Sequence, residues 1–450
     1  MQKFTLIITA VILFSSCGLY TKYQTPHLDK EQWLNQDIVS INKGFIMPSW
    51  DDFFEDQELI KLIEEGLSNN VDLKVAELNI EKNKALLTNA KLSVLPSFIL
   101  SPNATISSIG GNKASQSYQL PLTASWEVGV TGKVRNNKLK AKASLEQTEI
   151  YVQKVKTDLI AMIANNYFTI KMFDMQLESS RASAINLKSN IRVMKSLKQA
   201  GLQTDAAVQQ AISNFHRIEI SIKDLEKQIL QTEHALSILL FRTPGIIERS
   251  TEKGQIELKN IENGICFLNL SNRPDVRFNE LELAKLYYDT NIARGAFYPS
   301  ITLKGSIGWS WNGSITSNPA DLLISTVGSI AQPIFMQGRN RANLKVAKAS
   351  YDQARLNYQQ TLLKAGNEVN DALIIYDTAV RKLKIRDEQI KALKKAVSET
   401  ELLMIGGKNT YLEVLTAQDS YLRAKIENSS EWFEALQGKI NLFKSLGGYK

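Results

Sequence analysis

The 450-residue sequence has little cysteine, histidine and proline, and each shortage excludes a class of protein. Its two cysteines, Cys17 and Cys266, cannot form a disulfide framework, and no CxxC spacing indicates a zinc or redox site. The three histidines do not fall in an HExxH pattern, and neither a GxxxxGK[ST] phosphate loop nor a dinucleotide fingerprint occurs. We therefore predict that the protein is not an enzyme and holds no metal and no dissociable cofactor.

The charge is mildly basic, with 54 Lys and Arg against 46 Asp and Glu, a net charge of +8. The basic residues are spread along helical faces, which is typical of a solvated surface and argues against nucleic-acid binding. A hydrophobic content of 44% and a charged content of 22% exclude a disordered chain and a bundle of transmembrane helices. Ten prolines and long glycine-poor stretches indicate a largely helical protein.

The first residues have the pattern of an export signal. Residues 1–16, "MQKFTLIITAVILFSS", place Lys3 before an apolar run and then small residues, too short a run for a spanning helix. "LFSSCG" resembles the lipobox of bacterial lipoproteins, so we expect a covalent lipid on Cys17 and an extended, lipidated segment over 17–49. Gly18 after the cysteine favours delivery to the outer membrane. The alternative is an ordinary signal peptide with an incidental cysteine.

The rest of the chain contains an internal repeat. "NNVDLKVAELNIEK" from Asn69 returns as "NRPDVRFNELELAK" from Asn272, 203 residues later, and "AKAS" at 141–144 returns at 347–350, 206 residues later. Similar offsets held over such a length indicate a tandem duplication. The predicted segments are repeat 1 (50–241), a linker (242–256) and repeat 2 (257–447).

Each repeat contains two segments in which apolar and polar residues alternate. In repeat 1, Tyr118, Leu120 and Leu122 are separated by polar residues or proline, and Trp309 and Trp311 continue a similar rhythm in repeat 2. About ten residues with a two-residue period are typical of a membrane β-barrel strand, although a half-buried soluble sheet shows the same alternation. The four predicted strands are 98–107, 118–130, 301–312 and 322–335. Four strands cannot close a barrel, so three chains would have to supply twelve.

Two very long helices are expected, over about 133–199 and 338–405. The second could reach about 100 Å at ~1.5 Å per residue. Small apolar residues recur along it while charges fill the other faces, as in helices packed side by side. A break follows each helix, at 199–211 and 405–418, before a second long helix. An earlier helix, near 57–94, is stopped by the proline of "LPSF".

Four segments and the duplication together resemble the TolC-type outer-membrane efflux channels, in their lipoprotein branch. The segments are "RPDVRFNELEL" (Arg273–Leu283), "ARGAFYPSITLKGS" (Ala293–Ser306), "QPIFMQGRNRANLKVAKASY" (Gln332–Tyr351) and "GGKNTYLEVLTAQDSYLRAK" (Gly406–Lys425). The resemblance implies an α+β membrane protein, a homotrimer whose twelve-stranded outer-membrane β-barrel continues into a long periplasmic α-helical barrel. It also implies docking on a periplasmic adaptor and an inner-membrane pump, and passive export of drugs, toxic compounds or metals.

In this family the periplasmic entrance lies at the turn before each second long helix, where acidic side chains narrow the pore. Glu413 stands where the family commonly has an aspartate, and Thr416 where a second acid often follows. Asp205 lies two positions before the usual acid position of the matching turn, which holds Ala207. The resemblance therefore implies a weaker acidic ring, with one Glu per chain. The alternative for Glu413 is a solvated acid favoured by the helix dipole.

Three further residues of the second turn are candidates for the closed state. We expect Lys408, Asn409 and Tyr411 to make polar contacts between neighbouring helices there.

The strand-to-helix stretch "QPIFMQGRNRANLKVAKASY" leaves almost no room for a loop. Gly132 and Gly338 are expected to permit the turn at the membrane surface, and Arg339 and Arg341 to lie at the level of the inner lipid headgroups. Strand and helix would then be one continuous pore wall in contact with outer-membrane lipid.

Two other classes of protein remain open from the sequence. A periplasmic adaptor or a structural coiled-coil lipoprotein also carries a lipobox and long helical hairpins, but an adaptor has one hairpin flanked by β-rich modules. A type I secretion channel would share the fold. No Met or His cluster favours metal as the cargo.

Overall fold

The computed structural model describes residues 21–25, 49–108, 110, 114–250, 256, 270–312 and 321–448. The predicted signal peptide, Cys17 and Cys266 lie outside these residues. The chain forms two compact units. The sheet unit comprises Met1–Leu28, Glu77–Ile150 and Arg277–Thr361, and the helical unit comprises Asp29–Ala76, Tyr151–Val276 and Leu362–Lys450.

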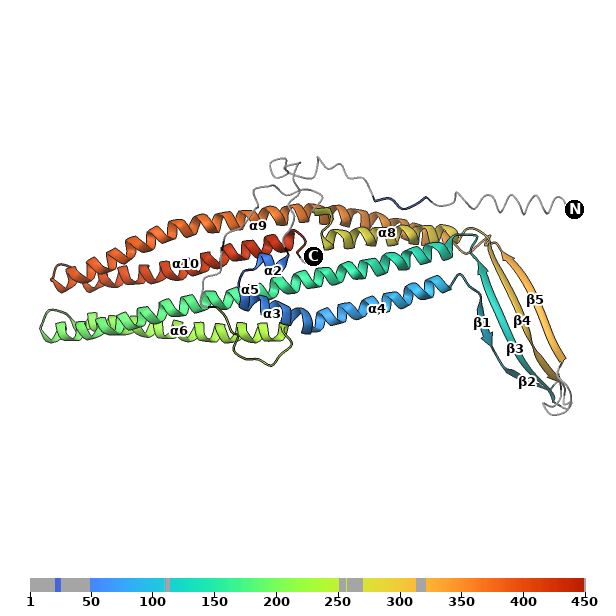
Figure 1. The fold of residues 1–450 in the computed structure, drawn as a ribbon, viewed down its shortest axis with the longest axis horizontal. Helices are drawn as coiled ribbons and strands as arrows, with labels where there is room; N and C mark the ends of the chain where they lie inside the picture. Colours follow the sequence, from blue (N-terminus) through green and yellow to red (C-terminus); the bar gives the residue numbers. More distant parts are fainter. Residues whose placement is uncertain are drawn as a thin grey trace. The chain divides into compact units, whose positions relative to one another are not determined.

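The order of the elements repeats itself along the chain (Figure 1). The elements of the first repeat are α2 (Trp50–Phe53), α3 (Gln57–Asn69), α4 (Val71–Leu92), β1 (Ser97–Leu100), β2 (Asn103–Ser107), β3 (Ser115–Val128), α5 (Lys133–Gln199) and α6 (Asp205–Leu239). Those of the second are α8 (Pro274–Gly295), β4 (Ser300–Asn312), β5 (Asp321–Ala331), α9 (Arg339–Ile405) and α10 (Tyr411–Ser445). Helices α5 and α9 have 67 residues each, and α6 and α10 have 35 each. Equal lengths at equal offsets confirm the tandem duplication.

The sheet is antiparallel, in the order β1-β3-β4-β5, with β2 also paired to β3 (Figure 1). Its register places Leu122 opposite Ile307 and Ile307 opposite Ile324, so apolar side chains align on one face. This face is not covered by the rest of the described chain, since Trp309 is 49% exposed and Ile330 is 73% exposed. An apolar face of this extent needs an apolar environment.

The other face of the sheet is polar. Thr123 lies opposite Ser306, and Ser306 lies opposite Ser325 in the next strand, with 2.7 Å between the two serine hydroxyls. The Ser329 hydroxyl donates to the backbone oxygen of Thr302 at 3.3 Å. The predicted alternation is therefore confirmed, one face apolar and the other polar.

The predicted strand bounds were wrong in places, for identifiable reasons. The segment 98–107 is two strands because Pro102 has no N–H to donate to the ladder. Ser101 still donates its N–H to Pro121 of β3 at 3.1 Å, so both parts follow the same neighbour. Strand β5 ends at Ala331, before Pro333, four residues short of the predicted end.

The helix predicted over 57–94 is also interrupted. Asn70 ends α3 and begins α4, since its side-chain oxygen accepts the N–H of Leu73 at 3.0 Å while its amide donates to the backbone oxygen of Leu239 at 2.9 Å. The predicted end of this helix is confirmed, because α4 ends at Leu92, shortly before the proline of "LPSF".

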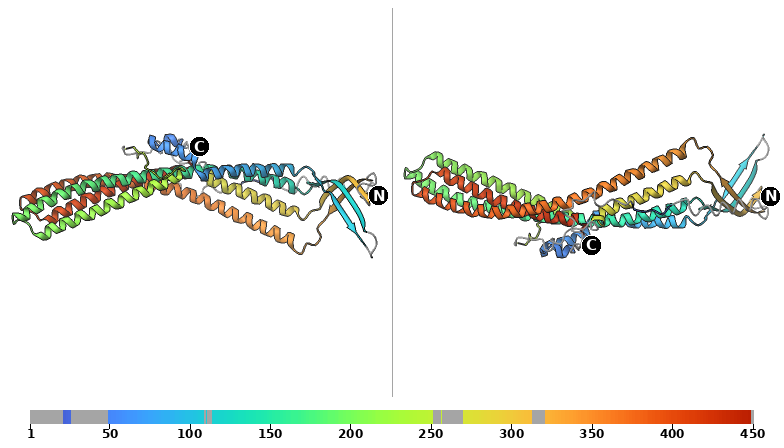
Figure 2. Two further views of the ribbon diagram at one scale, coloured as in Figure 1. Left: turned by 90° about the horizontal axis from the view of Figure 1, so that it is seen from below. Right: turned by 90° about the horizontal axis from the view of Figure 1, so that it is seen from above.

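In the helical unit, α5 and α6 form one hairpin and α9 and α10 another (Figure 2). The hairpins pack through buried apolar residues, and Phe168 of α5 meets Trp432 of α10 edge-on at 6.0 Å between ring centroids. Gly438 lets α10 approach the backbone of Tyr376 in α9, where a Cβ would lie 2.8 Å from the Tyr376 nitrogen. Of the helices in the described part of the chain, none is both long and apolar enough to span a bilayer.

Candidate functional site

The two turns that join the long helices have the same backbone. After α5, Gly201 adopts φ +73°, and the N–H of Leu202 donates to the oxygen of Leu197 at 2.9 Å. After α9, Gly407 adopts φ +68°, and the N–H of Lys408 donates to Leu403 at 2.9 Å. This is the Schellman ending, in which a left-handed glycine closes the helix. Both turns are thus set by local sequence.

A buried apolar cluster lies directly behind both turns. Its members come from all four long helices: Met194, Val208, Ala211, Met404, Tyr411 and Val414. The cluster packs the ends of the two hairpins against each other within one chain. The two turns therefore lie close together at one end of the helical unit.

The two predicted acidic residues differ in their surroundings. Asp205 pairs with Lys198 at 2.5 Å, and this hydrogen bond holds the pKa of the Asp205 carboxyl below its usual value. Glu413 is exposed in the first turn of α10 and accepts a hydrogen bond from the neutral hydroxyl of Thr410 at 3.2 Å. The charge of Asp205 is compensated within the turn, so Glu413 is the stronger candidate for attracting cations.

The remaining candidates of the second turn have local roles. Thr416 is exposed and donates its hydroxyl to the backbone oxygen of Leu412 at 2.8 Å. Asn409 accepts the N–H of Thr410 at 2.9 Å, and Lys408 is exposed. These contacts shape the start of α10. Their predicted role between neighbouring helices of an assembly stays a prediction.

Tyr411 lies in the apolar cluster rather than at the surface. It is 4% exposed, burial raises the pKa of its phenol, and its hydroxyl has no hydrogen-bond partner among the described residues. The ring thus packs behind the turns, within the chain. The predicted polar contact of its hydroxyl with a neighbouring helix is not found among the described residues.

The strand–helix junctions are built on left-handed glycines. Gly132 has φ +68° and Gly338 has φ +79°, and each backbone oxygen accepts the first helical N–H, from Asn136 and Ala342 respectively, at 2.9 Å. A residue with a side chain is strained at such a φ, which explains glycine at both positions. Four residues (129–132) separate β3 from α5 and seven (332–338) separate β5 from α9, so the connection is as short as predicted after β3 and longer than predicted after β5.

The second junction carries an apolar stretch followed by cationic side chains. Ile334 is 95% exposed and Phe335 is 82% exposed, and Arg339 and Arg341 are exposed at the start of α9. Asn340 ties the junction to the end of α8, with its amide donating to the oxygen of Ala296 at 2.9 Å. The sequence of apolar and then basic residues matches the order of lipid tails and headgroups.

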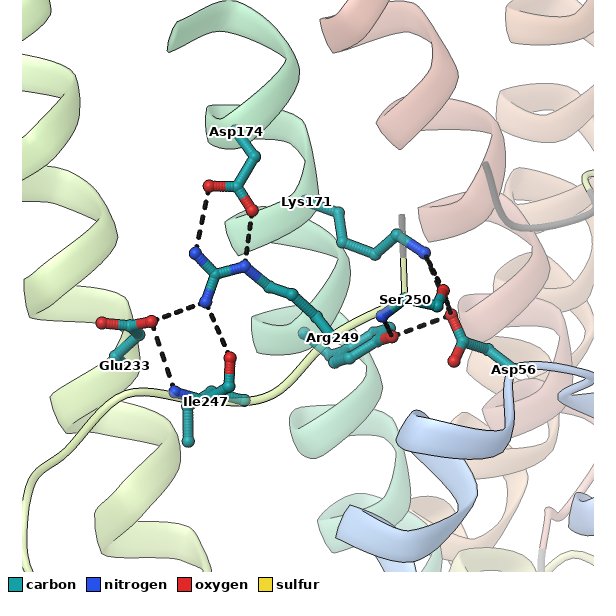
Figure 3. A network of polar contacts seen from close by, with 8 residues as sticks. Asp56, Lys171, Asp174, Glu233, Ile247, Arg249 and Ser250 are labelled. Carbon is teal, nitrogen blue, oxygen red and sulfur yellow. Dashed lines mark hydrogen bonds and ion pairs between the residues drawn. The ribbon is translucent and has the colours of Figure 1, made fainter. Parts of the chain in front are cut away.

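A polar network in the helical unit, made of buried and half-buried side chains, was not predicted from the sequence (Figure 3). Arg249, near the end of the described linker, forms two hydrogen bonds with Asp174 of α5, of 2.5 and 3.1 Å. It also donates to Glu233 of α6 at 2.6 Å and to the oxygen of Ile247 at 2.8 Å. Asp174 and Glu233 are distant from Arg249 in the sequence, so no local spacing of residues predicts these contacts. The network fixes the linker to both helices of the first hairpin.

The next linker residue continues this network to the start of α3 (Figure 3). One carboxylate oxygen of Asp56 accepts hydrogen bonds from Lys171 at 3.0 Å, Tyr167 at 2.8 Å and the Ser250 hydroxyl at 2.8 Å. Burial by itself raises the pKa of Asp56, but the hydrogen bonds from Ser250, Lys171 and Tyr167 outweigh it and hold the pKa below its usual 3.8. The ionised form of Asp56 is therefore the one that stabilises the fold.

Asp56 should make the stability of the helical unit sensitive to acid. Because its pKa is lowered on folding, its stabilisation is fully present above pH ~4 and is lost as the pH falls below that value. We expect Asp56→Asn to lower the thermal unfolding temperature at pH 7, and the difference from the wild type to shrink toward pH 3. Thermal unfolding in detergent between pH 7 and pH 3 measures this. Asp224→Asn, at an exposed ion pair with Lys227, is the control and should cost little at any pH. A constant deficit for Asp56→Asn across this range would contradict the assignment.

In the part of the chain that the structure describes, no three His, Cys, Asp or Glu residues gather as a metal site would require.

The comparison with protein families gives two matches. The family described as outer membrane efflux protein matches residues 62–240 and again residues 268–448. The two matches cover most of the chain and correspond to its two repeats.

Individual proteins match along nearly their whole length. The chain is 26% identical to "Probable outer membrane lipoprotein SilC" of Salmonella typhimurium, covering 99% of this chain and 98% of that protein. It is 26% identical to "Solvent efflux pump outer membrane protein SrpC" of Pseudomonas putida, covering 98% and 97%. A crystal structure of CusC superposes with a TM-score of 0.87 at 24% identity, covering 96% of this chain and all of that one. The fold is thus that of a known outer-membrane channel, with its small β-barrel part and its helical barrel.

Proposed function

The chain belongs to the outer membrane efflux protein family, and from this premise we propose that three copies form one passive channel from the periplasm through the outer membrane. The main support for a trimer is the unpaired edges of the sheet. Among the described strands, β5 pairs only with β4, and β1 and β2 pair only with β3. The sheet of one chain therefore has two open edges and an exposed apolar face.

Open edges are not viable in lipid, because each unsatisfied backbone N–H or C=O there costs several kcal/mol. The open edge of β5 offers its backbone groups along 11 residues. Pairing it with β1 and β2 of a neighbouring copy satisfies both edges at once. Because β1 and β2 both pair with β3, one after the other along it, they count as one strand of a barrel. Each chain then supplies four barrel strands, and three chains supply twelve.

Closure in this way puts the apolar face toward lipid and the polar face toward the lumen. The exposed Ile334 and Phe335 then meet the acyl chains, and Arg339 and Arg341 meet the inner headgroups. A covalent lipid on Cys17 adds a second anchor. The lumen continues between the long helices to the turns at Gly201 and Gly407.

The channel supplies a path and no catalysis. We propose that a periplasmic adaptor connects the turns to an inner-membrane pump, which provides the energy. Of the similar proteins, SrpC is named for solvent efflux and CusC for cation efflux. We propose small molecules as the cargo class here, with cations favoured at the entrance by Glu413.

The oligomer is tested on the purified full-length protein. We expect a band of three times the monomer mass on unboiled gels, collapsing on boiling, and recovery with the outer-membrane fraction. A monomer that high salt releases from membranes would rule out the channel and favour a peripheral lipoprotein.

Glu413 is tested by selectivity. We expect Glu413→Gln to lower the cation-to-anion permeability ratio in planar bilayers by about twofold or more, because a ring of three carboxylates loses its charge. The control is Glu388→Gln, which removes another exposed acid, paired with Lys391 on α9, and should leave the ratio unchanged. Unchanged selectivity in Glu413→Gln would show that Glu413 does not line the constriction.

A further inference from the structure

The polar face of the sheet carries very little charge. Residues directly opposite one another in neighbouring strands share a face, so Ser306 and every second residue of β4 mark the polar one. In the described strands the charged residues of this face are Glu127 of β3, Lys304 of β4 and Asp321 of β5. Lys304 is the one lysine or arginine that these strands contain. A single cation thus stands on a face of otherwise mostly neutral polar residues.

The neighbours of Lys304 in the sheet do not neutralise it. Its side chain is exposed, and directly opposite it lie Ser125 of β3 and Val327 of β5. The nearest acid along β3 is Glu127, two residues beyond Ser125, and its carboxylate already pairs with Lys133 at 3.2 Å. Among the described residues, Lys304 therefore keeps its full charge without an ion pair.

The remaining acid and the neighbouring copies do not change this balance. Asp321 lies opposite Ser310, six residues from Lys304 and ~20 Å along the strand. The β1 and β2 strands of a neighbouring copy, which would pair with β5, consist of uncharged residues. Within the described strands, each copy thus contributes one cation at the level of Lys304, and three copies contribute three.

The size of the proposed barrel brings these three cations within range of the same ions. Twelve strands about 4.8 Å apart and tilted by ~40° close into a barrel about 24 Å across. The lysine charge is carried on a flexible four-carbon stem, so each ammonium group stands well inside the wall. At 0.1 M salt the Debye length is ~10 Å, and the fields of the three groups overlap in the lumen. At 1 M salt it is ~3 Å, and they are screened.

We propose that Lys304 forms a ring of three ammonium groups in the lumen of the β-barrel, which attracts small anions and opposes the cation preference conferred by Glu413. The inference rests on the proposed trimeric channel. It makes Lys304 a specificity-determining residue, because rings of basic side chains favour anions in pores and lumen-facing residues tune selectivity. Solutes that carry a carboxylate or a phosphate are the class that this level attracts.

The ring is tested first by the ion selectivity of the purified trimer in planar bilayers. We expect Lys304→Gln to raise the cation-to-anion permeability ratio about twofold at 0.1 M salt, because one charge per chain is lost. Lys304→Glu should raise the ratio further, and Lys304→Arg, which keeps the charge, should leave it unchanged. At about 1 M salt the difference between Lys304→Gln and the wild type should disappear, since the ring is screened.

The position of the side chain is tested by adding charge to the open channel. We expect Lys304→Cys to react with the cationic reagent 2-aminoethyl methanethiosulfonate, which forms a mixed disulfide, releases methanesulfinate and restores the wild-type ratio. The anionic 2-sulfonatoethyl methanethiosulfonate should instead raise the ratio, in three steps of current. The matched control is Leu303→Cys, which lies next to it on the apolar face and should respond to neither reagent. The wild type, treated in parallel, reports the native cysteines.

Failure of the ring and failure of the channel give different results. A conducting wild-type trimer whose permeability ratio is unchanged in Lys304→Gln at 0.1 M salt would overturn the ring alone. Equal responses of Lys304→Cys and Leu303→Cys to the charged reagents would also overturn it, because the two residues would not then lie on opposite faces. A wild-type trimer that inserts without conducting would overturn the proposed channel and the ring together.

Discussion

Gly308→Ala should abolish the heat-resistant trimer. Gly308 lies opposite Pro121 in the centre of the sheet, and a Cβ there would overlap the backbone oxygen of Leu120 and lie 2.6 Å from the Cα of Pro121. These are backbone atoms, so no side-chain rotation relieves the overlap, and β3 and β4 must separate. Because neighbouring chains have to continue the same sheet, a local separation of its two longest strands prevents closure. The measurement is the fraction of trimer on unboiled gels of membrane fractions.

Gly305→Ala is the matched control for this prediction. It lies on the same strand, three residues earlier, and the nearest atom to a Cβ there is the oxygen of Ser325 at 3.8 Å, an ordinary contact. We expect wild-type amounts of trimer from Gly305→Ala. Equal amounts of trimer from both variants would mean that β3 and β4 are not as close in the assembled protein as in this sheet.

Arg249→Met should destabilise the helical unit by about 3–5 kcal/mol, the usual cost of leaving a buried charge without its partner. The Glu233 side chain is only 3% exposed and would keep one described donor, the N–H of Ile247 at 3.3 Å. Asp174 would lose both of its hydrogen bonds from the guanidinium. Methionine keeps much of the side-chain volume, so the loss reports charge and hydrogen bonds rather than a cavity. Thermal unfolding in detergent at pH 7 measures the effect.

Arg242→Met is the control, because it removes another arginine of the linker that does not belong to the Arg249 network. Arg242 pairs with Glu65 at 3.3 Å, and both side chains are about one-third exposed. Exposed pairs contribute little, so we expect a loss of at most about 1 kcal/mol. Comparable losses from the two variants would show that the network around Arg249 does not fix the linker.

Features that depend on neighbours in the sequence could be predicted. The two-residue alternation around Leu122 and Trp309 gave the faces of the sheet, because side chains of a strand alternate between its faces. The two 67-residue helices were placed to within a residue. Gly132 and Gly338 were predicted to permit the turns before them, and both have the left-handed backbone that favours glycine. The duplication supplied each prediction twice.

Features that depend on distant partners could not be predicted. Arg249 lies 75 residues from Asp174 and 16 from Glu233, and nothing in "IIERS" indicates either. Tyr411 was predicted to make polar contacts because tyrosine carries a hydroxyl. Its ring is buried because four helices pack around it, and the sequence does not reveal that packing. The contacts of Tyr23 were missed for the same reason, since its partners Glu280 and Tyr287 lie more than 250 residues away.

Local interruptions were missed although their signals were present. Asn70 is a good helix cap and Pro102 is a poor strand residue, yet both lie inside longer patterns of the right period. In each case a single residue overrides the pattern by what its backbone or side chain can bond.

The central claim, that this protein forms an open path through the outer membrane, is tested most directly by single-channel recording. The purified trimer, added to one side of a planar bilayer, should insert and give discrete, long-lived conductance steps. The Glu413→Gln trimer should give such steps with a lower preference for cations. Stable trimer that inserts in the bilayer and gives no conductance steps at any voltage would contradict the claim.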